Sequence, residues 1–169
     1  MDLLNSRPHA ATGSLDTLHA DQAANALLRP FGHPDAVAPS PERLADVRAL
    51  RATLMTIVAA PDSAEAAPGW AELTERASSV TLRHTFSAPG TGLQQVDGDP
   101  VVGGITLAVA QLVTEGTWPR IRACANELCR HVFYDTTRSR TQRWHSYEMC
   151  GNKNNVAAYR ARKKTLADG

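Results

Sequence analysis

The feature that most constrains this chain is the placement of its three cysteines and one histidine in its last third. Cys124 and Cys129 are separated by four residues, and His145 and Cys150 are also separated by four. Two pairs of soft ligands with equal internal spacing, 15 residues apart, fit one tetrahedral zinc ion held by two half-sites. Since four protein ligands leave no coordination position for water, the pattern predicts one structural Zn²⁺ rather than a catalytic one.

Two other interpretations of these residues stay open. Three cysteines can be small buried core residues that bind no metal. His131, two residues after Cys129, competes with His145 as the fourth ligand. A ligand at His131 would strain the first loop and leave the second half-site with one member. We therefore predict these metal ligands: Cys124, Cys129, His145 and Cys150.

The net charge of the chain changes sign just before the cysteines. Residues 1–118 carry 7 arginines and no lysine against 13 acidic residues, a net charge of −6. Residues 119–169 carry 11 basic and 4 acidic residues, a net charge of +7. A basic module indicates a polyanionic partner, most often nucleic acid, unless the two halves neutralise each other across an internal interface. We therefore predict a first domain over residues 1–118 and a zinc-binding domain over residues 119–169.

Apolar periodicity predicts that the first domain is mostly helical. We expect helices from Leu18 to Arg29, from Pro41 to about Ala59, and from Pro100 to Gly116. The second helix starts with a hydroxyl cap and a proline at its first position, and its arginines are expected to form a solvated face. Residues 61–69 are expected to be a connector before a short helix that contains Trp70.

A β-hairpin is expected between these helices. Residues 80–86 alternate between apolar and polar side chains, which predicts a strand with one buried face, and residues 93–97 return as its partner. On the buried face, His84 is expected to be a hydrogen-bonded core residue rather than a ligand. The fold class is therefore α+β, mostly α. A pocket between this hairpin and the helix that starts at Pro100 is where we expect a small-molecule effector.

In the basic module, short strands over residues 120–123 and 132–134 are expected to form a knuckle around the first cysteine pair. A final basic helix is expected from about Asn154 to Lys164. Aromatic residues are expected to form a small core: Phe133, Trp144 and Tyr159. The residues predicted to contact nucleic acid are Arg138, Arg140, Arg143, Asn152, Lys153, Arg160, Arg162, Lys163 and Lys164. Asn152 has two interpretations, as a reader of bases and as a helix cap.

Several of these features occur in an order that is specific to one family. They are Cys124 with Cys129, Phe133-Tyr134-Asp135, Arg138-Ser139-Arg140, Trp144 directly before a ligand, Cys150-Gly151-Asn152-Lys153, and Tyr159-Arg160-Ala161-Arg162. This order resembles the CGNR zinc-finger family, whose members typically carry an N-terminal ABATE domain described as a stress-induced transcription regulator. The first 118 residues look like the ABATE half more loosely, through Asp2-Leu3-Leu4-Asn5-Ser6 and Leu50-Arg51.

The resemblance implies a treble-clef-like finger with a DNA-binding role. His145 stands where the family usually has cysteine, which gives a Cys3His site. Lys153 stands where the family usually has arginine. The positive charge is kept, but the planar guanidinium that can form two parallel hydrogen bonds is lost.

The function predicted from these patterns is a DNA-binding transcriptional regulator whose first domain senses an effector or forms a homodimer. The alternative is a zinc-stabilised adaptor that binds protein and no nucleic acid. We expect no enzymatic activity, because four ligands leave the metal without an open position. We expect no membrane span and no signal peptide, and thiolates reserved for a metal indicate the reducing cytoplasm.

Overall fold

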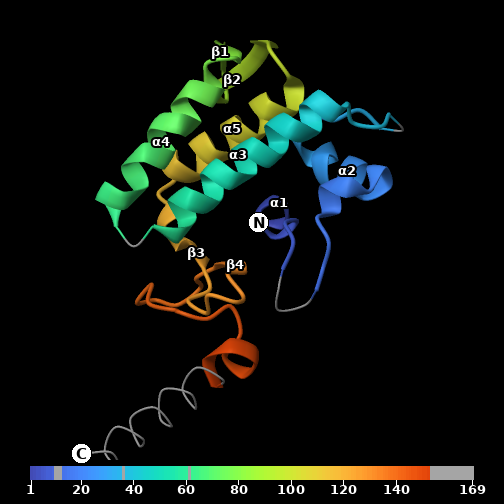
Figure 1. Cartoon of the computed structure of the whole chain (residues 1–169). Helices are drawn as coiled ribbons and strands as arrows, with labels where there is room; N and C mark the ends of the chain where they lie inside the picture. Colours follow the sequence, from blue (N-terminus) through green and yellow to red (C-terminus); the bar gives the residue numbers. More distant parts are fainter. Residues whose placement is uncertain (10–12, 36, 61, 153–169) are drawn as a thin grey trace, which may run out of the picture.

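A computed structural model describes residues 1–9, 13–35, 37–60 and 62–152 of the chain (Figure 1). The elements in chain order are α1 (Asp2–Asn5), η1 (Thr17–His19), α2 (Asp21–Leu28), η2 (Arg29–Phe31), α3 (Pro41–Ala59), α4 (Ser63–Ala77), β1 (Thr81–Ser87), β2 (Gly90–Asp97), α5 (Pro100–Thr114), η3 (Trp118–Arg120), β3 (Ile121–Ala123), β4 (Val132–Tyr134) and η4 (Tyr147–Gly151). The α+β class with a majority of helix is confirmed. The final helix predicted from Asn154 to Lys164 lies outside the described residues.

Three helices, α3, α4 and α5, lie side by side and enclose the main hydrophobic core (Figure 1). Apolar side chains at helical spacing on α3 and α5 are buried there, including Val47, Leu50, Val101 and Ile105. Side-chain caps start two of these helices, α3 as predicted and α5 as well. The Ser40 hydroxyl accepts a hydrogen bond from the N–H of Arg43, and the Asp99 carboxylate accepts from the first turn of α5. Within the described residues, no helix has the length and apolarity needed to cross a membrane.

Two predicted helix boundaries were wrong. The connector expected over residues 61–69 is already helical from Ser63, because the Asp62 carboxylate caps α4 by accepting from the N–H groups of Ala64 and Glu65. The single helix expected from Leu18 to Arg29 is divided into η1, α2 and η2.

The solvated arginine face predicted for α3 is also wrong. Arg51 is only 6% exposed, and its guanidinium forms a buried ion pair with Asp16. It also donates to the hydroxyl of Ser6, at 2.7 Å. Arg43 pairs with Asp99 at 2.7 Å. The partners come from segments distant in sequence, so the pattern within α3 alone could not reveal them.

The predicted hairpin is confirmed, but its predicted buried face is wrong. Strands β1 and β2 pair antiparallel with His84 opposite Leu93, and both strands are exposed over almost their whole length. Phe86 is 78% exposed, and the His84 ring stacks against it at a centroid distance of 6.3 Å instead of lying in a core. The hairpin projects beyond the end of the helices (Figure 1), which cover too little of it to bury a face.

Between the hairpin and α5, where an effector pocket was expected, the Gln95 side chain lies against Gly103. A side chain added at Gly103 would meet Gln95 atoms within 3 Å. The Gln95 amide donates to three successive carbonyls, those of Asp97, Gly98 and Asp99. The effector itself stays an untested prediction.

The second hairpin, β3–β4, joins the helices to the cysteine-rich segment. Val132 is 1% exposed and belongs to the main core, and Ala123, its partner in the register, packs against the same core. Phe133, on the opposite face, packs with the cysteines instead. The domain boundary between residues 118 and 119 stays a prediction. The parts of the chain before and after it are in close contact.

Candidate metal centre

The first half-site is a tight turn that follows β3. The N–H of Cys124 donates to the His131 carbonyl at 2.8 Å and so closes the open end of the turn. The carbonyl of Asn126 accepts from the N–H groups of Cys129 and Arg130, each at 2.9 Å. Arg130 takes a left-handed conformation with φ of 52°. This knuckle directs the side chains of Cys124 and Cys129 to the same side.

The second half-site is a short loop with one helical turn. The Ser146 hydroxyl accepts from the N–H of Met149, and the Ser146 carbonyl accepts from the N–H of Cys150 at 3.0 Å. A Cβ added at Gly151 would lie 2.7 Å from the Tyr147 ring and 3.1 Å from Trp144. Glycine is thus required after Cys150 because the aromatic rings of this loop pack against its backbone.

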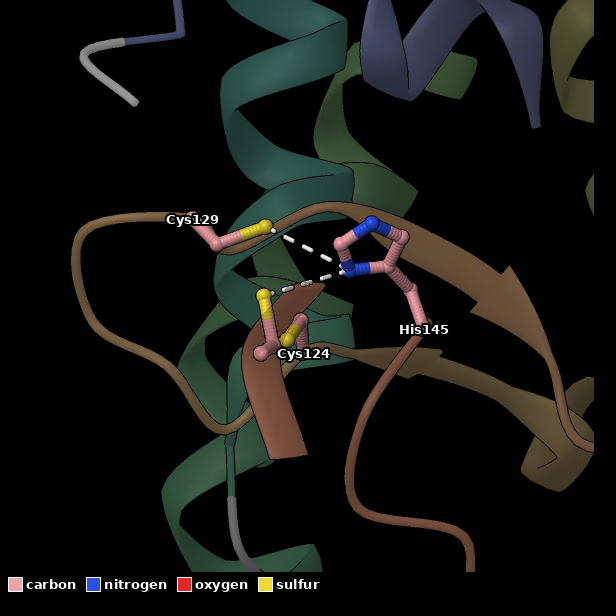
Figure 2. A group of neighbouring side chains, drawn as sticks. Cys124, Cys129 and His145 are labelled. Carbon is pink, nitrogen blue, oxygen red and sulfur yellow. Dashed lines mark hydrogen bonds between the residues drawn. The ribbon is translucent and has the colours of Figure 1, made fainter. Parts of the chain in front are cut away.

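The four predicted ligands lie together. One donor atom from each of Cys124, Cys129, His145 and Cys150 falls within 4.8 Å of every other. The labelled side chains in Figure 2 converge on one point. His145 Nδ1 lies 3.4 Å from the sulfur of Cys129 and 3.7 Å from that of Cys150. With Zn–S near 2.3 Å and Zn–N near 2.0 Å, the edge of a tetrahedral site is about 3.5 Å. The residues therefore fit a tetrahedral ion bound through Nδ1 of His145.

The burial of these four side chains favours a bound cation. The three cysteines are 0%, 8% and 4% exposed in chain order. Burial in the first place, and then the neighbouring Cys150 and Cys124, raise the pKa of the Cys129 thiol to about 11. Burial also lowers the pKa of His145, which favours the neutral imidazole that a metal requires. A divalent cation would remove the repulsion among three thiolates in this site.

His131, the competing ligand, lies beside the cluster but is not one of the four residues that form it. Its Nε2 accepts a hydrogen bond from the Asn5 amide at 3.2 Å. The His131 ring packs between those of His9 and His145, at centroid distances of 5.7 and 4.7 Å. Among the described residues, the histidine of the cluster is therefore His145.

The N-terminal segment holds the outer side of the knuckle. The side chain of Asn5 pairs with the backbone of Val132 at two points, donating to its carbonyl and accepting from its N–H, both at 2.8 Å. His9 lies between the carbonyls of Cys129 and Asn5, at 3.3 and 3.0 Å. Arg7 donates to the Arg130 carbonyl. Sequence reasoning missed these contacts, because isolated polar residues near the start of the chain carry no periodic signal.

A buried carboxylate shapes the basic loop between the two half-sites. Asp135 is 0% exposed, and its two oxygens accept from the N–H and hydroxyl of Thr137 and from the N–H of Gln142. Burial opposes ionisation of Asp135, but these hydrogen bonds and the charge of Arg122 lower its pKa below the ordinary value. Arg122 lies 3.6 Å from this carboxylate and also donates to the Arg140 carbonyl. The loop is therefore fixed by its own hydrogen bonds.

The structure describes four of the residues predicted to contact nucleic acid. Arg138 and Arg140 are exposed on the fixed loop, and Arg143 is exposed with its guanidinium 5.1 Å from the centre of the Trp144 ring. Asn152 follows η4, and its backbone N–H donates to the Tyr147 carbonyl. The remaining members lie outside the described residues: Lys153, Arg160, Arg162, Lys163 and Lys164. Of the predicted small core, Phe133 and Trp144 pack on the cysteines, and Tyr159 lies outside the described residues.

These observations define a zinc finger with a Cys3His ligand set. Residues 120–163 match the family model of the CGNR zinc finger. The match and the cluster together indicate one structural Zn²⁺, as the sequence predicts. A search of curated proteins finds no match to the chain.

Asn126 is a supporting residue that the sequence did not single out. Its amide nitrogen lies 3.6 Å from the sulfur of Cys150, toward which it donates, and its Oδ1 accepts from the N–H of Leu128. Replacing Asn126 with alanine is expected to weaken zinc binding by about 10–100-fold, because partners of the ligands orient them and stabilise the thiolate. A competition titration with a chromophoric chelator measures the change. The control is Ser139→Ala in the basic loop, and equal affinities for both variants would contradict this role.

Proposed function

We propose that this protein is a DNA-binding transcriptional regulator whose zinc is structural and which has no enzymatic activity. The observation that carries the proposal is the fixed loop beside the metal centre, which presents Arg138 and Arg140 to solvent. Arginines held on a rigid support lose little conformational freedom when they bind phosphate. The net charge of +7 over residues 119–169 supports the same partner. In this proposal the first 118 residues are an ABATE-like sensing or dimerisation domain, and the finger is treble-clef-like.

Binding of duplex DNA is expected to weaken steeply with salt. If about six basic residues meet phosphates, log Kd against log salt concentration should have a slope of magnitude about 5 between roughly 50 and 200 mM. Fluorescence anisotropy with a mixed-sequence duplex measures it. Arg138→Gln with Arg140→Gln should weaken binding and lower the magnitude of the slope by about 2.

The matched control is Arg83→Gln, which removes an exposed arginine from the hairpin far from the finger in sequence. It should leave both affinity and slope unchanged. Absence of DNA binding at low salt, or equal effects of the loop and control variants, would overturn the proposal.

The second candidate function is an adaptor that binds another protein through the finger. Three exposed apolar side chains on the finger favour it: Leu128, Tyr147 and Met149 are 74%, 63% and 57% exposed. Exposed apolar groups that gather are typical of protein interaction surfaces, and two of these three residues lie on the same element, η4. A salt-insensitive complex with protein, together with no retention of DNA, would favour this function over the first.

A further inference from the structure

A cavity lies where the helices meet the zinc finger. It is bounded by the end of α3, the start of α4, η3, and β3 with the knuckle that follows it. Its volume is about 540 Å³, within the range of small-molecule binding sites, and such sites often occur where two parts of a protein meet. This place differs from the one expected beside the hairpin.

Part of the cavity lining is apolar and aromatic. Trp70 and Trp118 line it with ring centroids 5.2 Å apart and planes tilted by 59°. Ile57, Ala66 and Ile121 also belong to the lining. Both tryptophans are only partly buried, so their rings can contact a ligand in the cavity. Such a surface suits an alkyl or aryl group.

Charged residues also line the cavity. Among the described residues of the lining these are Arg122 and Arg130, against one acidic residue, Asp62. Arg122 is paired with the Asp135 carboxylate, at 3.6 Å. The Asp62 carboxylate is already used as the cap of α4, where it accepts two N–H bonds at 2.9 Å. Within the described part of the chain, the Arg130 guanidinium has no hydrogen-bond or ion-pair partner.

We propose that this cavity binds an organic carboxylate with an apolar body. The two tryptophans would contact the body, and the Arg130 guanidinium would bind the carboxylate. Because Arg122 lines the same cavity and holds the Asp135 carboxylate and the Arg140 carbonyl, the ligand would lie beside the support of the basic loop. The size of the cavity and the charge of its lining carry this proposal, and it stands whether or not the protein binds DNA.

The test uses the full zinc-loaded chain with octanoate and 3-phenylpropionate as probes, and with octanamide and 3-phenylpropionamide as neutral controls. Calorimetry gives the affinities, and tryptophan fluorescence reports on the site because two of the three tryptophans line it. The carboxylates are expected to bind about tenfold or more tightly than the amides, since hydrogen bonds to charged groups are stronger than neutral ones. Arg130→Gln should reduce this preference about tenfold.

Filling the cavity gives the second arm of the test. Ala66→Phe should abolish binding while zinc content and circular dichroism stay unchanged. If this variant fails to fold, Ser63→Tyr, at an exposed position of the lining, replaces it. Equal affinity for carboxylates and amides, undiminished binding to a folded filled variant, or no binding of either carboxylate at about 10 mM would each overturn the proposal.

Discussion

Replacing His145 with alanine is expected to unfold the finger while the helices α3, α4 and α5 stay folded. Among the residues that the structure describes, the cysteine cluster has few apolar partners, chiefly Phe133 and Trp144, so we expect its stability to depend on the metal. A structural zinc contributes on the order of 10 kcal/mol to folding in finger peptides. With three ligands left, most of this contribution is lost. Hydrogen exchange should become fast over residues 124–151 and stay slow in α5.

A matched control exists in the exposed histidine of the hairpin. His84→Ala removes the same side chain from a site with no role in the cluster, and it should change neither zinc content nor hydrogen exchange in the finger. Chelation of zinc from the wild-type protein should reproduce the effect of His145→Ala. Slow exchange over residues 124–151 in the metal-free protein would show that packing against the helices alone holds the finger.

Breaking the buried ion pair between Arg51 and Asp16 is expected to give the second large effect. The two side chains are 8% and 7% exposed, and removing one charge leaves the other buried without a partner. Asp16→Asn should therefore lower the free energy of unfolding by about 3–5 kcal/mol. In a chain of this size, Tm should fall by roughly 10 °C in a thermal melt. Arg29→Gln, which breaks an exposed pair, should cost less than about 1 kcal/mol.

The stability that the ion pair between Arg51 and Asp16 contributes depends on pH. Burial opposes ionisation of Asp16, but hydrogen bonds from Arg51 and from the N–H of Leu18 outweigh it and lower the pKa of Asp16 below its ordinary value. A depressed pKa contributes stability that is fully present above about pH 4, the unfolded value, and is lost as the pH falls through the folded value. The stability difference between wild type and Asp16→Asn should therefore shrink in acid. A constant difference from pH 7 to pH 3 would contradict the ion pair.

The metal cluster could be predicted from the sequence because ligand chemistry and spacing are local. The pairs Cys124 with Cys129 and His145 with Cys150 each lie within one turn, and a single ion needs only that the two turns meet. The helices α3 and α5 could be predicted as well, because their caps and apolar periodicity lie within each segment. The sequence therefore predicts both the ligands of the metal site and these two helices.

The wrong predictions concern residues whose environment depends on partners distant in sequence. The alternation of residues 80–86 predicts a strand correctly, but nothing in it tells whether a helix covers the strand, and His84 is exposed. Arg51 looks solvated until Asp16 is placed beside it. The contacts of Asn5 with Val132 join residues 127 positions apart, a distance over which no local pattern carries information.

The most direct test of the central claim is zinc X-ray absorption on the purified protein, combined with elemental analysis. We predict one zinc per chain with a first shell of three sulfur atoms at about 2.3 Å and one nitrogen at about 2.0 Å. His145→Ala should remove the nitrogen, while His131→Ala should leave the shell unchanged. Clearly less than one zinc per chain, or a nitrogen that is lost in His131→Ala instead, would contradict the assignment.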